Sequence, residues 1–368
     1  MKKIGILTFH RATNYGAILQ AYALVSYLNN LGYDAKIIDY KPKGMGQLYA
    51  SVAVPGLVKK VKRIVLNILM LRTLNARKAK RNMYWDYISK VLPMTDPVLG
   101  ERDLPEFDAI FVGSDQVWST CFTGGVDKFY WGQFNRKGAK LMSYAGSAAE
   151  DMQGSFYSTD NAKLLMAFNK ISVREDELQI YLQKSLPEKE IVKVLDPTLM
   201  AGVSYFDELI KDEKPLERPY VLVYQVIRSR DSEIQNHAKQ LSKEYGCDVV
   251  EIKNGRLYTT TNGKTVVSDG LINPTQFVSL YKYAKHIVTT SFHGTAFSLL
   301  FNRPFDVVSV SPDVDSRAKD LLEQIGLGDR MVSLPIQTSK KDINWDLVNE
   351  TMDDYRKPSR QFIIDSLK

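Results

Sequence analysis

Thr289-Thr290-Ser291-Phe292-His293-Gly294-Thr295 joins two apolar runs, residues 286–290 and 296–301. The first run predicts a short buried strand and the second a helix. A strand that leads directly into a helix turns the free N–H groups and the positive dipole end of that helix toward a ligand. The turn therefore predicts an anion site around Ser291, Phe292, Gly294 and Thr295, where His293 can move a proton near neutral pH. The alternative is that Ser291 only caps the helix and His293 is a hydrogen-bonded polar residue.

The same alternation of apolar strands and helical stretches continues outward in both directions. Such a pattern predicts an α/β protein with two doubly wound, Rossmann-like domains facing a cleft. A polar, proline-containing break at residues 211–215 predicts the linker between them. We expect an N-terminal domain over residues 1–213 and a C-terminal domain over 214–335. A helical tail, 336–368, is expected to pack back across the first domain.

Composition excludes several classes of protein. A hydrophobic content of 44% and a charged content of 25% are typical of a globular chain in water, and no apolar run is long enough to cross a membrane. Two cysteines, Cys121 and Cys247, provide neither a disulfide framework nor a metal cluster. We therefore expect a cytoplasmic protein without a metal or a cofactor.

Positive charge is concentrated between residues 41 and 100, where twelve Lys and Arg face only Asp86 and Asp96, a net charge of +10. Apolar residues with helical spacing lie within it, so residues 55–92 are predicted as a basic helical segment. Such a segment can bind an anionic membrane surface, or it can be an ordinary surface helix. Few aromatic residues are interleaved with the charges, which argues against nucleic acid as a partner.

Further candidate site residues follow other predicted strands, where ligands of parallel sheets bind. Arg174 follows residues 170–173, and its guanidinium suits a phosphate or a carboxylate. Ser172 and Glu175 flank it with the spacing of a capping box. Arg228 and Arg317 are additional phosphate candidates.

Two other motifs suggest sugar recognition. Asn14-Tyr15-Gly16 opens the first helix, where glycine permits a close backbone approach to a ligand. Gly113-Ser114-Asp115-Gln116-Val117-Trp118 combines a carboxylate, an amide and an indole suited to sugar hydroxyls and a sugar face. The alternative for this second motif is an Asx-type turn with Trp118 in the core. Asp196-Pro197-Thr198 predicts a turn and a helix start, with Asp196 able to face the cleft.

Taken together, these motifs resemble the polysaccharide pyruvyl transferase family over residues 4–330. The resemblance implies a two-domain fold like that of GT-B glycosyltransferases, with phosphoenolpyruvate as donor substrate and a polysaccharide or lipid-linked sugar, as in exopolysaccharide or capsule synthesis, as acceptor. It implies a pyruvate ketal on two sugar hydroxyls, with release of phosphate. It also implies that Arg174 and His293 lie in the donor site, with the N-terminal domain on the acceptor side and the C-terminal domain on the donor side. The family often carries arginine two places before this histidine, where this chain has Ser291.

Roles follow from that chemistry as expectations. His293 is expected to be the general acid or a phosphate ligand, and Asp115 to be the base that deprotonates the acceptor. Donor contacts are expected from Arg174, Ser291, Phe292, Gly294, Thr295, Arg228 and Arg317, and acceptor contacts from Asn14, Tyr15, Gly16, Ser114, Gln116 and Trp118. Two other functions remain open: a GT-B glycosyltransferase that uses a nucleotide sugar, and a non-catalytic carbohydrate-binding or assembly protein. Peripheral binding at the inner face of the membrane is a further hypothesis.

Overall fold

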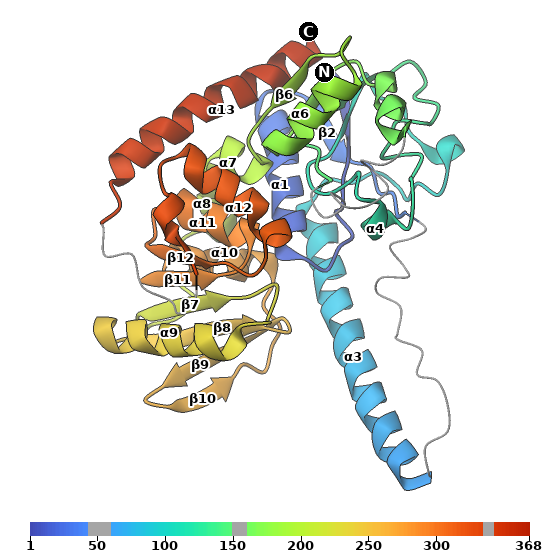
Figure 1. The fold of residues 1–368 in the computed structure, drawn as a ribbon. Coiled ribbons are helices and arrows are strands. Elements are labelled where there is room, and N and C mark those ends of the chain that lie inside the picture. The colour runs from blue at the N-terminus through green and yellow to red at the C-terminus, as the bar shows by residue number, and fades with distance from the viewer. Residues whose placement is uncertain (43–59, 149–159, 334–341) are drawn as a thin grey trace.

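Four parallel strands form the first sheet, in the order β2 (Asp34–Ile37), β1 (Lys3–Leu7), β3 (Ala109–Val112), β4 (Lys140–Ser143). The computed structural model describes residues 1–42, 60–148, 160–333 and 342–368 (Figure 1). In the centre of this sheet Ile6 pairs with Ile37 and Phe111, and all three are fully buried. Strands buried on both faces are what continuous apolar runs in a parallel sheet predict. Beyond β4 lie two further parallel strands, β5 (Ile171–Val173) and β6 (Ile191–Lys193).

The second sheet has seven strands. Five are parallel: β7 (Tyr220–Tyr224), β8 (Asp248–Lys253), β11 (His286–Thr289), β12 (Phe305–Val308) and β13 (Met331–Val332). At one edge, β9 (Arg256–Thr261) and β10 (Lys264–Val267) add an antiparallel hairpin. The α/β prediction with parallel sheets is confirmed.

Helices cover both sheets and connect the parallel strands. The longer ones are α1 (Tyr15–Asn30), α3 (Lys60–Val91), α6 (Asp176–Ser185), α8 (Val203–Ile210), α9 (Asp231–Tyr245), α10 (Pro274–Lys282), α11 (Phe292–Leu300), α12 (Pro312–Gln324) and α13 (Trp345–Leu367). Short helical turns are α4 (Thr120–Thr123), α7 (Pro197–Ala201), η1 (Glu101–Asp103), η3 (Asp160–Ala167) and η4 (Gly328–Arg330). The polar break at 211–215 lies between α8 and β7.

Two aromatic rings join the lobes. Tyr15 at the start of α1 stacks on Phe277 of α10, with 4.3 Å between ring centroids, and its hydroxyl donates to the Ile272 carbonyl. Both rings belong to one buried apolar cluster with members from both lobes. The burial of these apolar side chains between the lobes stabilises the position of one lobe relative to the other.

The C-terminal helix α13 packs back on the first lobe, as predicted (Figure 1). The Ser359 hydroxyl accepts a hydrogen bond from the Leu195 amide at 2.9 Å, and the Arg356 guanidinium donates to the Leu199 carbonyl. The tail therefore lies beside the loop that follows β6.

The basic segment predicted over 55–92 forms α3 from residue 60 onward, and residues 55–59 are outside the described part of the chain. Figure 1 shows α3 extending away from the two lobes. Its C-terminal end is anchored by buried Tyr84 and by the Tyr87 hydroxyl, 2.9 Å from the Thr275 hydroxyl. None of the described helices combines the length and the apolar content that a membrane crossing needs.

Candidate functional site

Helix α11 begins at Phe292, four residues earlier than the sequence predicted, so His293, Gly294 and Thr295 lie in its first turn. The Ser291 hydroxyl caps the helix by accepting from the Gly294 amide at 3.3 Å. Thr295 is fully buried, and its hydroxyl donates to the Ser291 carbonyl. The hydroxyls of Ser291 and Thr295 are therefore used by the helix itself, so the predicted donor contacts at this turn depend on its backbone N–H groups.

Gly294 is explained by packing within the second lobe. A Cβ atom at this position would lie 2.3 Å from Oγ1 of Thr289. The absence of a side chain lets the first turn of α11 sit against the end of β11. This close approach orients the helix N-terminus toward the first lobe.

The imidazole of His293, in the second lobe, packs against the first lobe at the site. A Cβ atom on Gly16, at the start of α1, would lie 2.1 Å from Nδ1 of His293. The sequence predicted that Gly16 admits a ligand, whereas in the structure it admits the imidazole ring. His293 is 9% exposed, and its Nε2 has no hydrogen-bond partner among the described residues. Burial lowers the pKa of His293, and the nearby carboxylates Asp196 and Asp115 oppose that effect.

Asp196 connects Arg174, His293 and Ser114. It follows β6 and caps α7, and its Oδ1 accepts from the amide and the hydroxyl of Thr198 at 3.0 and 2.7 Å. Its Oδ2 lies 2.8 Å from Nη1 of Arg174, 3.3 Å from the Ser114 hydroxyl and 3.8 Å from Nε2 of His293. Burial alone would raise the pKa of Asp196, but the charges of His293 and Arg174 lower it. A carboxylate in this position therefore links Arg174 of the first lobe to His293 of the second.

Arg174 is buried at the carboxyl end of β5. Besides Asp196 it contacts Glu175, whose Oε1 lies 3.1 Å from Nε, and its Nη2 has no hydrogen-bond partner among the described residues. The predicted capping box is wrong, because Ser172 lies in β5 and bonds to Ser143, and Glu175 instead accepts from the Ser147 hydroxyl at 2.7 Å. Arg174 thus keeps one donor free on a guanidinium whose orientation is fixed.

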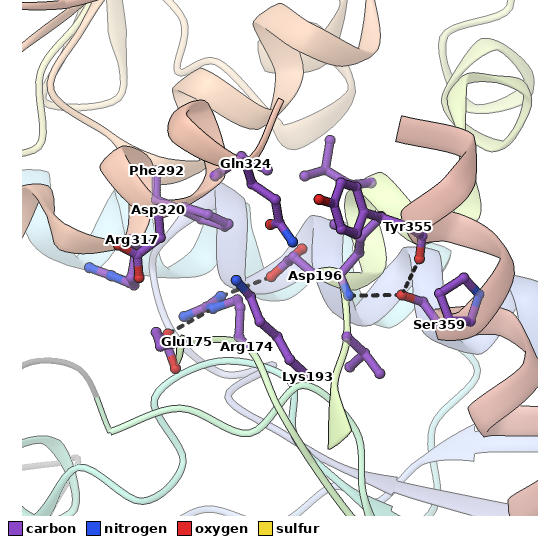
Figure 2. Close-up of a pocket in the computed structure, with 15 residues that line it drawn as sticks. Arg174, Glu175, Lys193, Asp196, Phe292, Arg317, Asp320, Gln324, Tyr355 and Ser359 are labelled. Atoms are coloured by element: carbon purple, nitrogen blue, oxygen red, sulfur yellow. Dashed lines mark hydrogen bonds and ion pairs between the residues drawn. The ribbon is translucent and has the colours of Figure 1, made fainter. Parts of the chain in front are cut away.

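Arg174 opens into a pocket between the lobes, called the Arg174 pocket here (Figure 2). Two guanidinium groups lie near the ring of Phe292, with Arg174 Cζ at 4.8 Å and Arg317 Cζ at 5.9 Å from its centroid. The remaining lining includes Glu175, Lys193, Val194, Leu195, Asp196, Leu199, Asp320, Leu321, Gln324, Tyr355, Pro358 and Ser359. Two cations held over one aromatic ring present planar hydrogen-bond donors suited to an anion with two acidic groups.

Only one of the two additional predicted cations reaches this pocket. Arg317 lines it, whereas Arg228 bonds to Asp231 at 2.7 Å and to Glu251 at 2.5 Å and is not among its lining residues. Arg228 therefore lies outside the Arg174 pocket, held by two carboxylates of its own lobe. Arg317 is the residue able to replace the cation that Ser291 does not provide.

Asp115 lies close to the same cluster. It has a left-handed backbone (φ 75°), is partly exposed, and its Oδ1 accepts from the Gln116 amide at 2.9 Å. Its charge raises the pKa of both His293 and Arg174, so the three groups interact electrostatically. The structure thus brings together Asp115, Arg174, Phe292, His293 and Arg317 among the predicted residues.

Several side chains that were predicted to contact the acceptor are instead used inside the fold. Trp118 is fully buried, and its indole N–H donates to the Tyr130 carbonyl. Tyr15 is buried against Phe277, and Ser114 bonds to Ala145 and Asp196. Asn14 is exposed while capping α1, and the buried Gln116 side chain has an amide nitrogen without a partner among the described residues.

The site unites segments far apart in the chain, and a family model spans nearly all of them. The model described as polysaccharide pyruvyl transferase matches residues 14–312. The chain belongs to the polysaccharide pyruvyl transferase family. Membership makes it a transferase of polysaccharide biosynthesis. Arg317, Asp320 and Tyr355 lie beyond the matched residues, so part of the Arg174 pocket comes from outside the matched region.

Other comparisons give weaker similarities. A sequence search finds no curated protein that matches. A UDP-GlcNAc 2-epimerase from Methanocaldococcus jannaschii is 11% identical, with a TM-score of 0.49 over 97% of this chain and 93% of that one. A UDP-N-acetylglucosamine 2-epimerase from Rickettsia bellii is 12% identical, with a TM-score of 0.46 over 97% and 88%. The E. coli heptosyltransferase WaaC is 10% identical, with a TM-score of 0.38 over 96% and 99%.

Proposed function

We propose that this pyruvyl transferase family member transfers the enolpyruvyl group of phosphoenolpyruvate to two hydroxyls of a sugar, forming a pyruvate ketal and releasing phosphate. The observation that carries the proposal is the Arg174–Phe292–Arg317 arrangement in the Arg174 pocket. Phosphoenolpyruvate carries a carboxylate and a phosphate, and a pair of guanidinium groups can bind one each. The reacting carbon would then lie near the first turn of α11, where His293 stands.

Binding measurements separate this function from its two alternatives. We expect calorimetric titration to show binding of phosphoenolpyruvate and weaker binding of inorganic phosphate. Phosphate release from phosphoenolpyruvate is then expected with at least one member of a panel of methyl and nitrophenyl glycosides. Binding of nucleotide sugars in place of phosphoenolpyruvate would instead support a GT-B glycosyltransferase. Glycoside binding without phosphate release and without phosphoenolpyruvate binding would support a non-catalytic carbohydrate-binding protein.

We further propose a lipid-linked acceptor at the inner face of the membrane, with the enzyme bound peripherally. The support is α3, which extends from the body and exposes basic side chains, including Arg77, Lys78 and Arg81. Leu74 on the same helix is 47% exposed. A basic helix with exposed apolar residues binds anionic bilayers through charge and apolar contact.

Neutralising three of these charges should weaken membrane binding. Each basic residue near an anionic surface contributes about 1 kcal/mol, so replacing Arg77, Lys78 and Arg81 with glutamine should reduce partitioning about 100-fold. Sedimentation with phosphatidylglycerol-containing vesicles measures this. A matched control replaces Lys239, Lys243 and Lys264, which are exposed on the second lobe. Equal binding of both variants, or equal wild-type binding to neutral vesicles, would contradict the membrane proposal.

A further inference from the structure

Asp320 is an acidic residue that lines the Arg174 pocket. It has no role in the proposed reaction as described so far. It lies on α12 three residues after Arg317, so the two side chains share one face of the helix. Both line the pocket together with Phe292 and Arg174. Figure 2 shows Asp320 beside Arg317 and Phe292, at the opposite end of the pocket from Tyr355 and Ser359. Asp320 therefore lines the pocket in which the donor is proposed to bind.

Charged groups from each neighbouring element face Asp320, and most are negative. They are Glu175 before α6, Asp176 and Glu177 in its first turn, Lys193 on β6, and Arg317 on its own helix. Lys193 is held by Asp176, with 2.6 Å between Nζ and Oδ2. Partial burial and these three carboxylates raise the pKa of Asp320 to about 6, and Lys193 opposes the shift. Asp320 therefore carries a proton in about a tenth of molecules at pH 7, far more often than a carboxyl group with an ordinary pKa.

The pKa of His293 shifts in the opposite direction from that of Asp320. Burial lowers its pKa, so the free imidazole is neutral at pH 7 and can accept a proton. An acid made less acidic and a base made less basic, on two sides of one site, are the usual arrangement for acid–base catalysis. Asp196 lines the same pocket as Asp320 and lies 3.8 Å from Nε2 of His293, so the imidazole stands next to a carboxylate of the pocket wall.

Resting on the proposed function, we infer that Asp320 is the catalytic acid that protonates the methylene carbon of phosphoenolpyruvate, with His293 as the base for the first acceptor hydroxyl. The carboxylic acid O–H bond breaks, a C–H bond forms at C3, and C2 becomes the electrophile. The first hydroxyl oxygen bonds to C2 and gives its proton to His293. The C2–O bond to phosphate then breaks, with its electron pair on the leaving oxygen, which takes the proton from His293. The second hydroxyl bonds to C2 and returns a proton to Asp320, so both groups regain their starting state.

Donor binding measures whether Asp320 faces the donor, and it needs no acceptor. With a pKa of about 6, about a tenth of Asp320 is protonated at pH 7. If the anionic donor binds the protonated form, Asp320→Asn should bind phosphoenolpyruvate up to about tenfold more tightly than the wild type at pH 7, and equally at pH 5. Titration in buffers of different ionisation enthalpy should show proton uptake that the variant lacks. Glu323→Gln, which removes an exposed charge from the same helix, should behave as the wild type.

Turnover then tests the acid role. With a glycoside from the panel that supports phosphate release, Asp320→Asn should lower kcat by about 10²–10⁴-fold while KM for phosphoenolpyruvate stays equal or falls. Tighter binding with lost turnover is a split that a purely structural residue would not produce. Equal donor binding by variant and wild type at both pH values, or normal kcat in the variant, overturns the inference and leaves the proposed function standing. A wild type that does not bind phosphoenolpyruvate overturns the proposed function and the inference with it.

Discussion

Replacing His293 with glutamine is expected to lower kcat for phosphate release by about 10²–10⁴-fold, because a positioned proton-transfer group contributes about that much. Gly16→Ala should act in the same direction without touching the imidazole chemically. Its Cβ atom would lie 2.1 Å from Nδ1 of His293, so the ring or the start of α1 must move. A displacement of about 1 Å in a reacting group can cost about 100-fold. The rate of phosphate release with an active glycoside from the panel measures the kcat of both variants.

Gly100→Ala is the matched control, because a Cβ atom there meets nothing within 4 Å. Unimpaired kcat in Gly16→Ala, or a loss below tenfold in His293→Gln, would count against His293 as a proton carrier. Stability supplies a second measurement. Since burial lowers the pKa of His293, the unfolded chain binds protons more readily below pH about 6.5. The free energy of unfolding should therefore fall as the pH drops below that value, and less so in His293→Gln.

The fold was largely predictable because its signals are local. Each central strand, such as β1 or β11, is a continuous apolar run, and burial on both faces of a parallel sheet requires that pattern. The start of α11 was misplaced by four residues because His293 and Gly294 interrupt the apolar pattern. Both lie in the first turn of the helix, where Gly294 packs against Thr289. The predicted capping box failed similarly, since the partner of Ser172 is Ser143 on a neighbouring strand.

The site was predictable as a set of residues but not as a set of contacts. Arg174, Asp115 and His293 could be identified because each follows a strand whose end faces the cleft. The role of Asp196 depends on three partners in distant segments, Ser114, Arg174 and His293, and no local pattern contains them. Trp118 was misassigned because an indole in a turn has the same sequence whether it faces a sugar or the core.

Arg174→Met is expected to lose phosphoenolpyruvate binding and to destabilise the protein by about 3–5 kcal/mol, because it leaves the Asp196 carboxylate buried without its guanidinium partner. Side-chain exposure is 3% for Arg174 and 0% for Asp196, so solvent cannot replace the contact. Denaturant unfolding measures the stability change, and calorimetric titration measures donor binding. Arg174→Lys should retain the charge but not both contacts, since Glu175 and Asp196 are met by different nitrogens of one planar group.

A double variant separates folding from function at this position. The single variant Arg174→Met leaves the buried charge of Asp196 without a partner. Adding Asp196→Asn removes that charge, so much of the lost stability should return. Donor binding should not return, because the guanidinium that meets the substrate is still absent. Recovery of both properties would place Arg174 in the fold alone, and recovery of neither would mean that Asp196 needs its charge for Thr198 and His293 rather than for Arg174. The expected split, stability regained without binding, follows only if one arginine both neutralises Asp196 and presents its free nitrogen to the donor.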